Sequence, residues 1–145
     1  MSIFVITGAD PIHRSAHGIP REVIAQLAGR AASAGKVIAI RNCHGSADVL
    51  QCLERAERDN AEFILIDPGT PERIDANLLH ALDNLPIPYI EVHADCVCAS
   101  RDSPDIGHPL HVVQGYRAQS YVLALSIALE HLGHAECENN VHVGT

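Results

Sequence analysis

The feature that most constrains the fold is a regular alternation of short apolar runs with longer amphipathic stretches. The runs are rich in Ile, Val and Leu, which predicts strands, and the stretches repeat their apolar residues at helical spacing. Predicted strands cover residues 2–7, 36–40, 62–66, 87–92 and 111–115, and predicted helices cover residues 21–35, 49–60, 74–85 and 116–133. This order predicts a parallel sheet between two helical layers. Right-handed crossovers then favour a flavodoxin-like, doubly wound α/β/α fold with five parallel strands.

Two of the predicted helices have clear end signals and inward faces. The first has Gly35 as its stop signal, and the second has Asp48 as its predicted N-cap. The residues predicted to face inward are Val23, Ile24, Leu27, Ala28 and Ala31 in the first helix, and Val49, Cys52, Leu53 and Ala56 in the second.

Length and composition indicate how many domains the chain forms and which kinds of partner it can bind. The chain has 145 residues, of which 47% are hydrophobic, enough for the core of one domain. We expect that domain to span residues 1–133 and the polar residues 134–145 to form a solvated tail. A formal net charge of −8 argues against nucleic acid or an anionic membrane as a partner, because both attract basic proteins. Five cysteines at irregular spacings indicate a reducing compartment such as the cytoplasm.

Polar residues directly follow two of the apolar runs. Asp67 follows the third predicted strand, and Glu91 and His93 end the fourth. Residues two apart on a strand point to the same face, and doubly wound sheets bind ligands beyond the carboxyl ends of their strands. The pattern therefore predicts a polar site at that edge, with Glu91 orienting the imidazole of His93. A structural pair that only fixes the strand end is the alternative interpretation.

Four motifs in this order resemble those of the type II dehydroquinases (type II 3-dehydroquinate dehydratases). "ITG" lies where the family has a strand ending in Asn-Gly-Pro-Asn, and "DPG" matches its Asn-Pro-Gly. "IPYIEVH" matches Ile-Pro-x-Ile-Glu-Val-His, and "GYRAQSYVLAL" matches Gly-x-x-x-Gln-Gly-Tyr-x-x-Ala-Leu. The four motifs occupy residues 6–8, 67–69, 87–93 and 115–125. The chain is thus similar to this family over almost its whole length, as a divergent member.

The resemblance implies a fold, an activity and a set of site residues. Family members eliminate water from 3-dehydroquinate by acid–base chemistry without a cofactor, and they assemble as trimers and dodecamers. The chain is therefore expected to be a homo-oligomer that binds a small polar cyclic molecule and needs no cofactor. His93 falls on the family's general-acid His, and Glu91 on the Glu beside it. The substrate-binding positions fall on Asp67, Gly69, Arg73, Ala94 and Asp95.

The loop after the first strand departs from the family pattern. The family's loop carries a catalytic Tyr and an Arg that activates it, whereas residues 9–20 read "ADPIHRSAHGIP" and contain no Tyr. Arg14 is the nearest counterpart of the Arg. His17 precedes Gly18 as the family's Tyr precedes its Gly, which makes His17 the only candidate base by position.

Two substitutions put negative charge where the family has neutral groups. Asp67 replaces an Asn, and Asp95 replaces a Ser. Dehydroquinate is an anion, and two like charges 4 Å apart repel by roughly 4 kcal/mol at an effective dielectric constant of 20. We therefore expect weak dehydroquinase activity or none.

Three functions stay open at this point. The chain is an acid–base, lyase-type enzyme acting on a small polar cyclic molecule, a non-catalytic binding or scaffold protein that keeps the family oligomer, or an active dehydratase with a relocated base. Metal binding is not predicted, because a C-x-C pair without a second pair is a weak signal. The candidate ligands set aside on this ground are Cys96 and Cys98 beside His93 and Asp95. A second group, His131, His134, Cys137 and His142 near the C-terminus, is interpreted instead as part of a loose polar tail.

Overall fold

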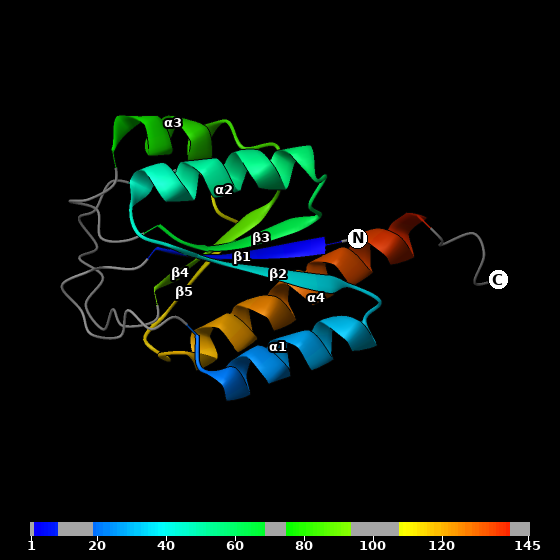
Figure 1. Ribbon diagram of the computed structural model, residues 1–145. Coiled ribbons are helices and arrows are strands. Elements are labelled where there is room, and N and C mark those ends of the chain that lie inside the picture. Colours follow the sequence, from blue (N-terminus) through cyan, green and yellow to red (C-terminus); the bar gives the residue numbers. More distant parts are fainter. Residues whose placement is uncertain (1, 9–18, 69–74, 94–107, 140–145) are drawn as a thin grey trace.

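A computed structural model of the chain describes residues 2–8, 19–68, 75–93 and 108–139 (Figure 1). Its strands form one five-stranded sheet in the order β2-β1-β3-β4-β5, and every neighbouring pair is parallel. This is the flavodoxin-like strand order, as predicted. The elements are β1 (Ser2–Gly8), α1 (Arg21–Ser33), β2 (Val37–Cys43), α2 (Ser46–Arg58), β3 (Phe63–Asp67), α3 (Ala76–Asp83), β4 (Tyr89–His93), β5 (His111–Gln114) and α4 (Gln119–Asn139).

The sheet lies between two helical layers, with α2 and α3 on one face and α1 and α4 on the other (Figure 1). Successive residues of a strand point to opposite faces, so each central strand contributes to two hydrophobic cores. On β1, Ile3 and Val5 pack with the α1/α4 layer, whereas Phe4 and Ile6 pack with the α2/α3 layer. Because both faces of β1 and β3 are buried, these two strands are nearly continuous apolar runs rather than alternating ones.

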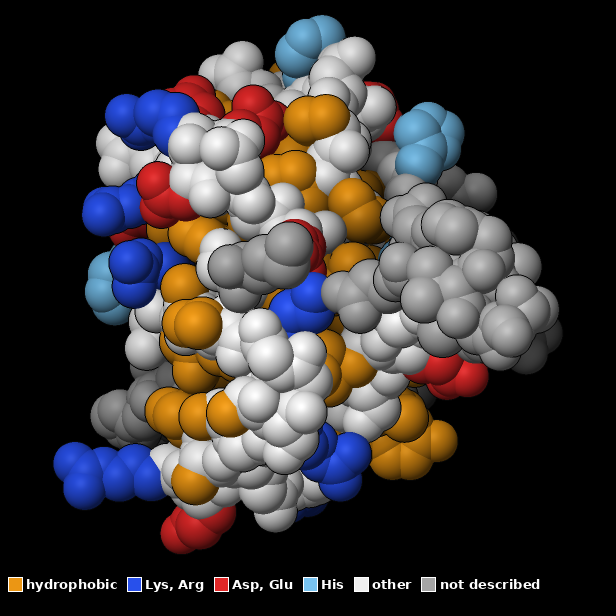
Figure 2. Space-filling view, turned by 90° about the vertical axis from the view of Figure 1, so that its right-hand side faces the viewer, with side chains coloured by type: hydrophobic (Ala, Val, Ile, Leu, Met, Phe, Trp, Pro, Cys, Tyr) orange, Lys and Arg blue, Asp and Glu red, His pale blue; other side chains and the backbone are white. Residues whose placement is uncertain are grey.

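An ion pair ties the strands together at the amino edge of the sheet, where the strands begin. Lys36 Nζ lies 2.8 Å from Glu62 Oε2. Lys36 precedes β2 and Glu62 precedes β3, on either side of β1. Lys36 is the only lysine in the sequence and is 7% exposed. Figure 2 views this edge of the molecule and shows hydrophobic side chains running down its middle.

Some local predictions were wrong. Helix α2 begins at Ser46, so its N-cap is Gly45, and Asp48 lies in the first turn. There the Oδ2 atom of Asp48 accepts a hydrogen bond from the backbone N–H of His44 (3.2 Å). Ala28, predicted to face inward, is exposed. Helix α4 continues to Asn139, six residues beyond its predicted end at residue 133.

The stop signal of α1 is confirmed. Gly35 takes a left-handed backbone conformation (φ 75°), which glycine adopts without steric cost. Its N–H donates to the carbonyl of Ala32 (3.0 Å) and so satisfies one of the last carbonyl groups of the helix. Among the described residues, no helix combines the length and the hydrophobicity needed to cross a membrane.

Candidate acid–base site

Glu91 and His93 form a hydrogen-bonded pair at the carboxyl edge, where the strands end. Glu91 Oε1 lies 2.6 Å from His93 Nε2. Both follow Tyr89 at two-residue intervals on β4, and Tyr89 packs in the α2/α3 core. The pair therefore points to the α2/α3 side of the sheet. The His93 side chain keeps 20% of its surface exposed, against 12% for Glu91, so the imidazole is reachable while the carboxylate behind it is mostly buried.

The surroundings of His93 favour its protonated form. Burial by itself would lower the pKa of His93, because it removes water from the imidazolium. The hydrogen bond from the ring to Glu91, the negative charge of Glu91 and that of Asp67 act in the opposite direction and prevail, so the pKa of His93 is raised above its usual 6.5. A His with a raised pKa carries more protons at neutral pH and is suited to donate one.

A second polar group lies on the neighbouring strands of the same edge. Thr7 of β1 pairs in register with Asn42 of β2 and with Asp67 of β3. Thr7 Oγ1 donates a hydrogen bond to Asn42 Oδ1 (2.7 Å). Thr7 lies two residues after Val5, which packs in the α1/α4 core. Asn42 and Asp67 are the register partners of Thr7, so their side chains point to the same face of the sheet as its own. They therefore point to the other side of the sheet from Glu91 and His93.

Of these three residues the sequence interpretation identified only Asp67. Thr7 was assigned to a buried strand and Asn42 to a loop, because β2 was predicted to end at residue 40. The available signal was the same in all three cases, a polar residue at the carboxyl end of an apolar strand. The negative charge of Asp67 on β3 also acts on His93 of the neighbouring strand β4 and helps to raise the pKa of His93.

The remaining predicted site residues lie outside the described part of the chain. They are the candidate base His17, with Arg14 from the same segment, and the predicted substrate-binding residues Gly69, Arg73, Ala94 and Asp95. Cys96 and Cys98 lie outside it as well. In the ranges that the structure describes, no group of three or more His, Cys, Asp or Glu side chains could hold a metal ion.

A surface hollow of about 340 Å³ lies away from the pair. Its lining residues are Leu110, His111, Ile127, Glu130 and His131. His111 begins β5, and Ile127, Glu130 and His131 come from the middle of α4, which runs back toward the amino edge (Figure 1). The hollow is thus at the opposite edge of the sheet from His93.

The fold and the pair together define a flavodoxin-like α/β protein with an acid–base pair at the carboxyl edge of its sheet. Residues 17–129 match the family model described as dehydroquinase class II. The chain therefore belongs to the class II dehydroquinase family.

Comparisons with individual proteins make it a divergent member. It is 27% identical over 123 residues to a 3-dehydroquinate dehydratase of Xylella fastidiosa, covering 77% of this chain and 78% of the relative. The type II dehydroquinase structure from Propionibacterium acnes superposes with a TM-score of 0.68 at 20% identity, over 89% of this chain and 98% of that one. A 3-dehydroquinate dehydratase-like protein from Bifidobacterium longum gives a TM-score of 0.63 at 16% identity, over 91% and 98%.

Proposed function

We propose that the protein is an acid–base enzyme of the lyase type that acts on a small polar cyclic molecule at the carboxyl edge of the sheet. The observation that carries this proposal is the 2.6 Å hydrogen bond between Glu91 Oε1 and His93 Nε2. Glu91 holds the ring through Nε2, which leaves Nδ1 to exchange a proton with the substrate. His93 is then the general acid that protonates a departing hydroxyl group, and Glu91 is its positioning residue.

We further propose that 3-dehydroquinate is a poor substrate. The support is the negative charge of Asp67, which acts on His93 from the neighbouring strand and would repel an anionic ligand bound there, and the absence of Tyr from residues 9–20. Tyr89, on the same face as the pair, does not replace the missing base, because burial raises the pKa of its hydroxyl to about 12. In this proposal His17 is the base, and Arg14, Gly69, Arg73, Ala94 and Asp95 complete the binding site.

One observation favours a second candidate, an active dehydratase whose base has been relocated. Tyr116 follows β5 at the same edge and is 62% exposed. Its neighbour Gly115 donates a backbone hydrogen bond to the carbonyl of His93 (3.2 Å). Tyr116 is therefore the tyrosine best placed to serve a reaction at His93.

We infer a homo-oligomer built from trimers, as the family resemblance implies, located in the cytoplasm. Apolar side chains at the surface agree with burial against other copies. Within the described ranges, the large exposed ones are Val37, Leu110, Val112, Tyr116 and Leu123.

The proposed function is tested by searching for a compound from which the protein eliminates water. The purified protein is incubated with 3-dehydroquinate and with a panel of hydroxylated ring compounds of positive, neutral and negative charge, and products lighter by one water are detected by mass spectrometry. We expect a product from a panel member other than 3-dehydroquinate. Loss of that product in His93→Gln, by roughly 10²–10⁴ in rate, would support the general-acid role.

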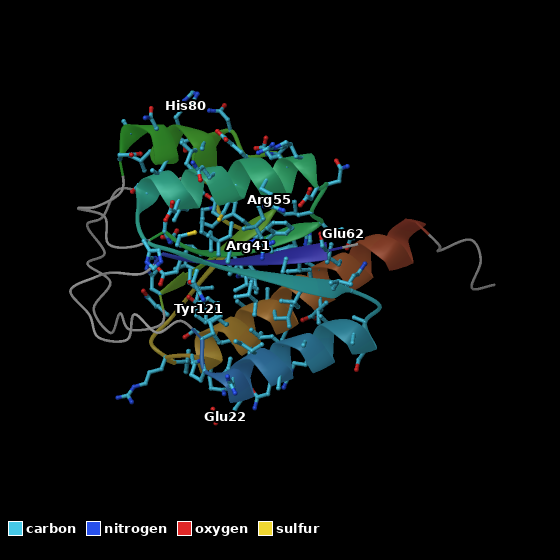
Figure 3. All side chains as sticks on the ribbon, in the orientation of Figure 1. Glu22, Arg41, Arg55, Glu62, His80 and Tyr121 are labelled. Carbon is cyan, nitrogen blue, oxygen red and sulfur yellow. The ribbon has the colours of Figure 1, made fainter. Side chains whose placement is uncertain are left out.

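The matched control is His80→Gln, because His80 is exposed on α3 and projects away from the sheet (Figure 3). Tyr116→Phe separates the two candidates, since only the relocated-base mechanism needs its hydroxyl. Turnover of 3-dehydroquinate as fast as that of the Xylella fastidiosa relative assayed alongside would contradict the proposed substrate preference. Unchanged turnover in His93→Gln would contradict the mechanism itself.

A further inference from the structure

Two cysteine sulfurs lie in contact beside the candidate site. Cys43 Sγ, at the end of β2, is 3.3 Å from Cys52 Sγ, in α2. Cys43 is only 1% exposed, whereas Cys52 is partly exposed and packs against the same core. The proposed acid–base chemistry uses neither thiol, so the contact needs an explanation of its own.

The fold itself brings the two thiols together. Strand β2 ends at Cys43, two residues form the turn, and α2 runs back over the sheet from Ser46. Val49, Leu53 and Ala56 form the buried face of α2. Cys52 adjoins that face at a three-residue spacing from Val49, which brings it over the end of β2.

We propose that Cys43 and Cys52 form a reversible intramolecular disulfide by exchange with a low-molecular-weight disulfide such as oxidised glutathione. A disulfide joins its sulfurs at about 2.05 Å, so these two sulfurs need to approach by little more than one ångström. Such a movement lies within the reach of side-chain rotation and small shifts of α2. The bridge would fasten α2 to the end of β2.

The exchange takes place in two balanced steps. Cys52, which solvent can reach, loses its proton and attacks one sulfur of oxidised glutathione, which forms a mixed disulfide and releases one glutathione thiolate that takes up a proton. Cys43 then attacks the Cys52 sulfur, and the second glutathione leaves with the proton of Cys43. The protein dithiol is oxidised, and one oxidised glutathione is reduced to two thiols. The order of the steps follows from burial, which raises the pKa of Cys43 to about 12 and so makes it the poorer first nucleophile.

The position of the bridge connects it to the candidate site. Cys43 is the register partner of Gly8, the residue that follows Thr7 on β1. Both belong to the same carboxyl edge as His93 on β4. The dithiol is thus a redox-active group of the edge at which the substrate is proposed to bind, although its formation does not depend on that proposal.

The sequence offers a direct assay. Trypsin cleaves after Arg41 and Arg55, so one peptide, residues 42–55, contains both cysteines and no other. The folded wild-type protein is equilibrated with mixtures of oxidised and reduced glutathione, quenched with acid and alkylated. The oxidised peptide is lighter by two hydrogens than the reduced one and takes up no alkylating reagent. The same equilibration in urea gives the constant for the unfolded chain.

We expect the equilibrium constant for disulfide formation to be at least roughly tenfold larger in the folded protein, because the fold holds the sulfurs adjacent. A constant equal to or smaller than that of the unfolded chain would overturn the proposal and leave the contact as packing alone. A variant with Cys96, Cys98 and Cys137 changed to Ser repeats the measurement without competing thiols. Cys52→Ser is the control, in which peptide 42–55 cannot lose two hydrogens.

Discussion

Glu91 and His93 come from the same strand, two residues apart, and their side chains meet at 2.6 Å between Oε1 and Nε2. The carboxylate therefore acts on the imidazole directly. We predict that Glu91→Gln lowers the pKa of His93, because burial of the ring remains while the opposing charge is lost. The measurement is an NMR titration of the imidazole resonances. His80→Gln, which removes a distant exposed imidazole, should leave the His93 titration in place, and an unchanged pKa in Glu91→Gln would contradict the assignment.

The raised pKa of His93 also predicts how stability depends on pH. A group whose pKa is higher in the folded state than in the unfolded chain binds protons more tightly when folded, so its protonation stabilises the fold. This contribution is fully present below the unfolded pKa of about 6.5 and is lost as pH rises through the higher folded pKa. We expect urea denaturation to give a free-energy difference between wild type and His93→Gln that shrinks as pH rises through this window. A difference that grows with pH would be incompatible with the raised value.

The charge of Asp67 is expected to limit activity toward an anionic substrate. Asp67→Asn restores the amide found in the family motif and removes a repulsion of up to roughly 4 kcal/mol. Since 1.4 kcal/mol corresponds to tenfold, we predict at least a tenfold increase in kcat/KM for 3-dehydroquinate. Asp59→Asn is the matched control, because it removes the same charge from an exposed side chain at the far end of α2. Equal effects of the two substitutions would assign the gain to net charge alone.

The Lys36–Glu62 pair should matter for stability more than a surface pair does. Only 5% of the Lys36 side chain is exposed, and Glu62→Ala removes the carboxylate that pairs with its ammonium group. We expect a loss of about 3 kcal/mol in the free energy of unfolding. Asp59→Ala breaks the Arg55–Asp59 pair, whose side chains are more than half exposed, and should cost less than about 1 kcal/mol. Figure 3 labels Arg55 and Glu62. Urea denaturation of both variants makes the comparison, and similar losses would refute it.

The proposed assembly predicts a defined particle mass. Sedimentation equilibrium at micromolar protein concentration should give a multiple of three chains, because the exposed apolar side chains, Val37 at 65% and Val112 at 52% among them, would be buried between copies. A mass of one or two chains under these conditions would exclude a trimer-based assembly.

The order of the elements was predictable because it depends on hydrophobic periodicity, which the sequence displays directly. The residues at which the elements begin and end were less predictable than their order. Strand β2 was predicted to stop at residue 40, where its apolar run ends, yet Arg41, Asn42 and Cys43 continue it. Their backbone groups pair with β1 through Gly8, and backbone pairing leaves no mark on the side-chain pattern.

The same limit explains what was missed at the site. Glu91 and His93 were predicted from their spacing on one strand, and the structure brings them together. The contacts between Thr7 and Asn42 and between Cys43 and Cys52 join residues whose positions follow from the true end of β2. Because the predicted end of β2 was three residues too early, neither of these two contacts was predicted.

The burial of Lys36 has a consequence for any chemistry directed at amines. The other basic residues of the chain with permanent charge are arginines, and the single ε-amino group pairs with Glu62 on a side chain of which only 5% is exposed. Acylating reagents, amine-reactive cross-linkers and enzymes that conjugate proteins to lysine would find no ε-amine on the folded surface. Labelling at Lys36 would instead report that the amino edge of the sheet had opened.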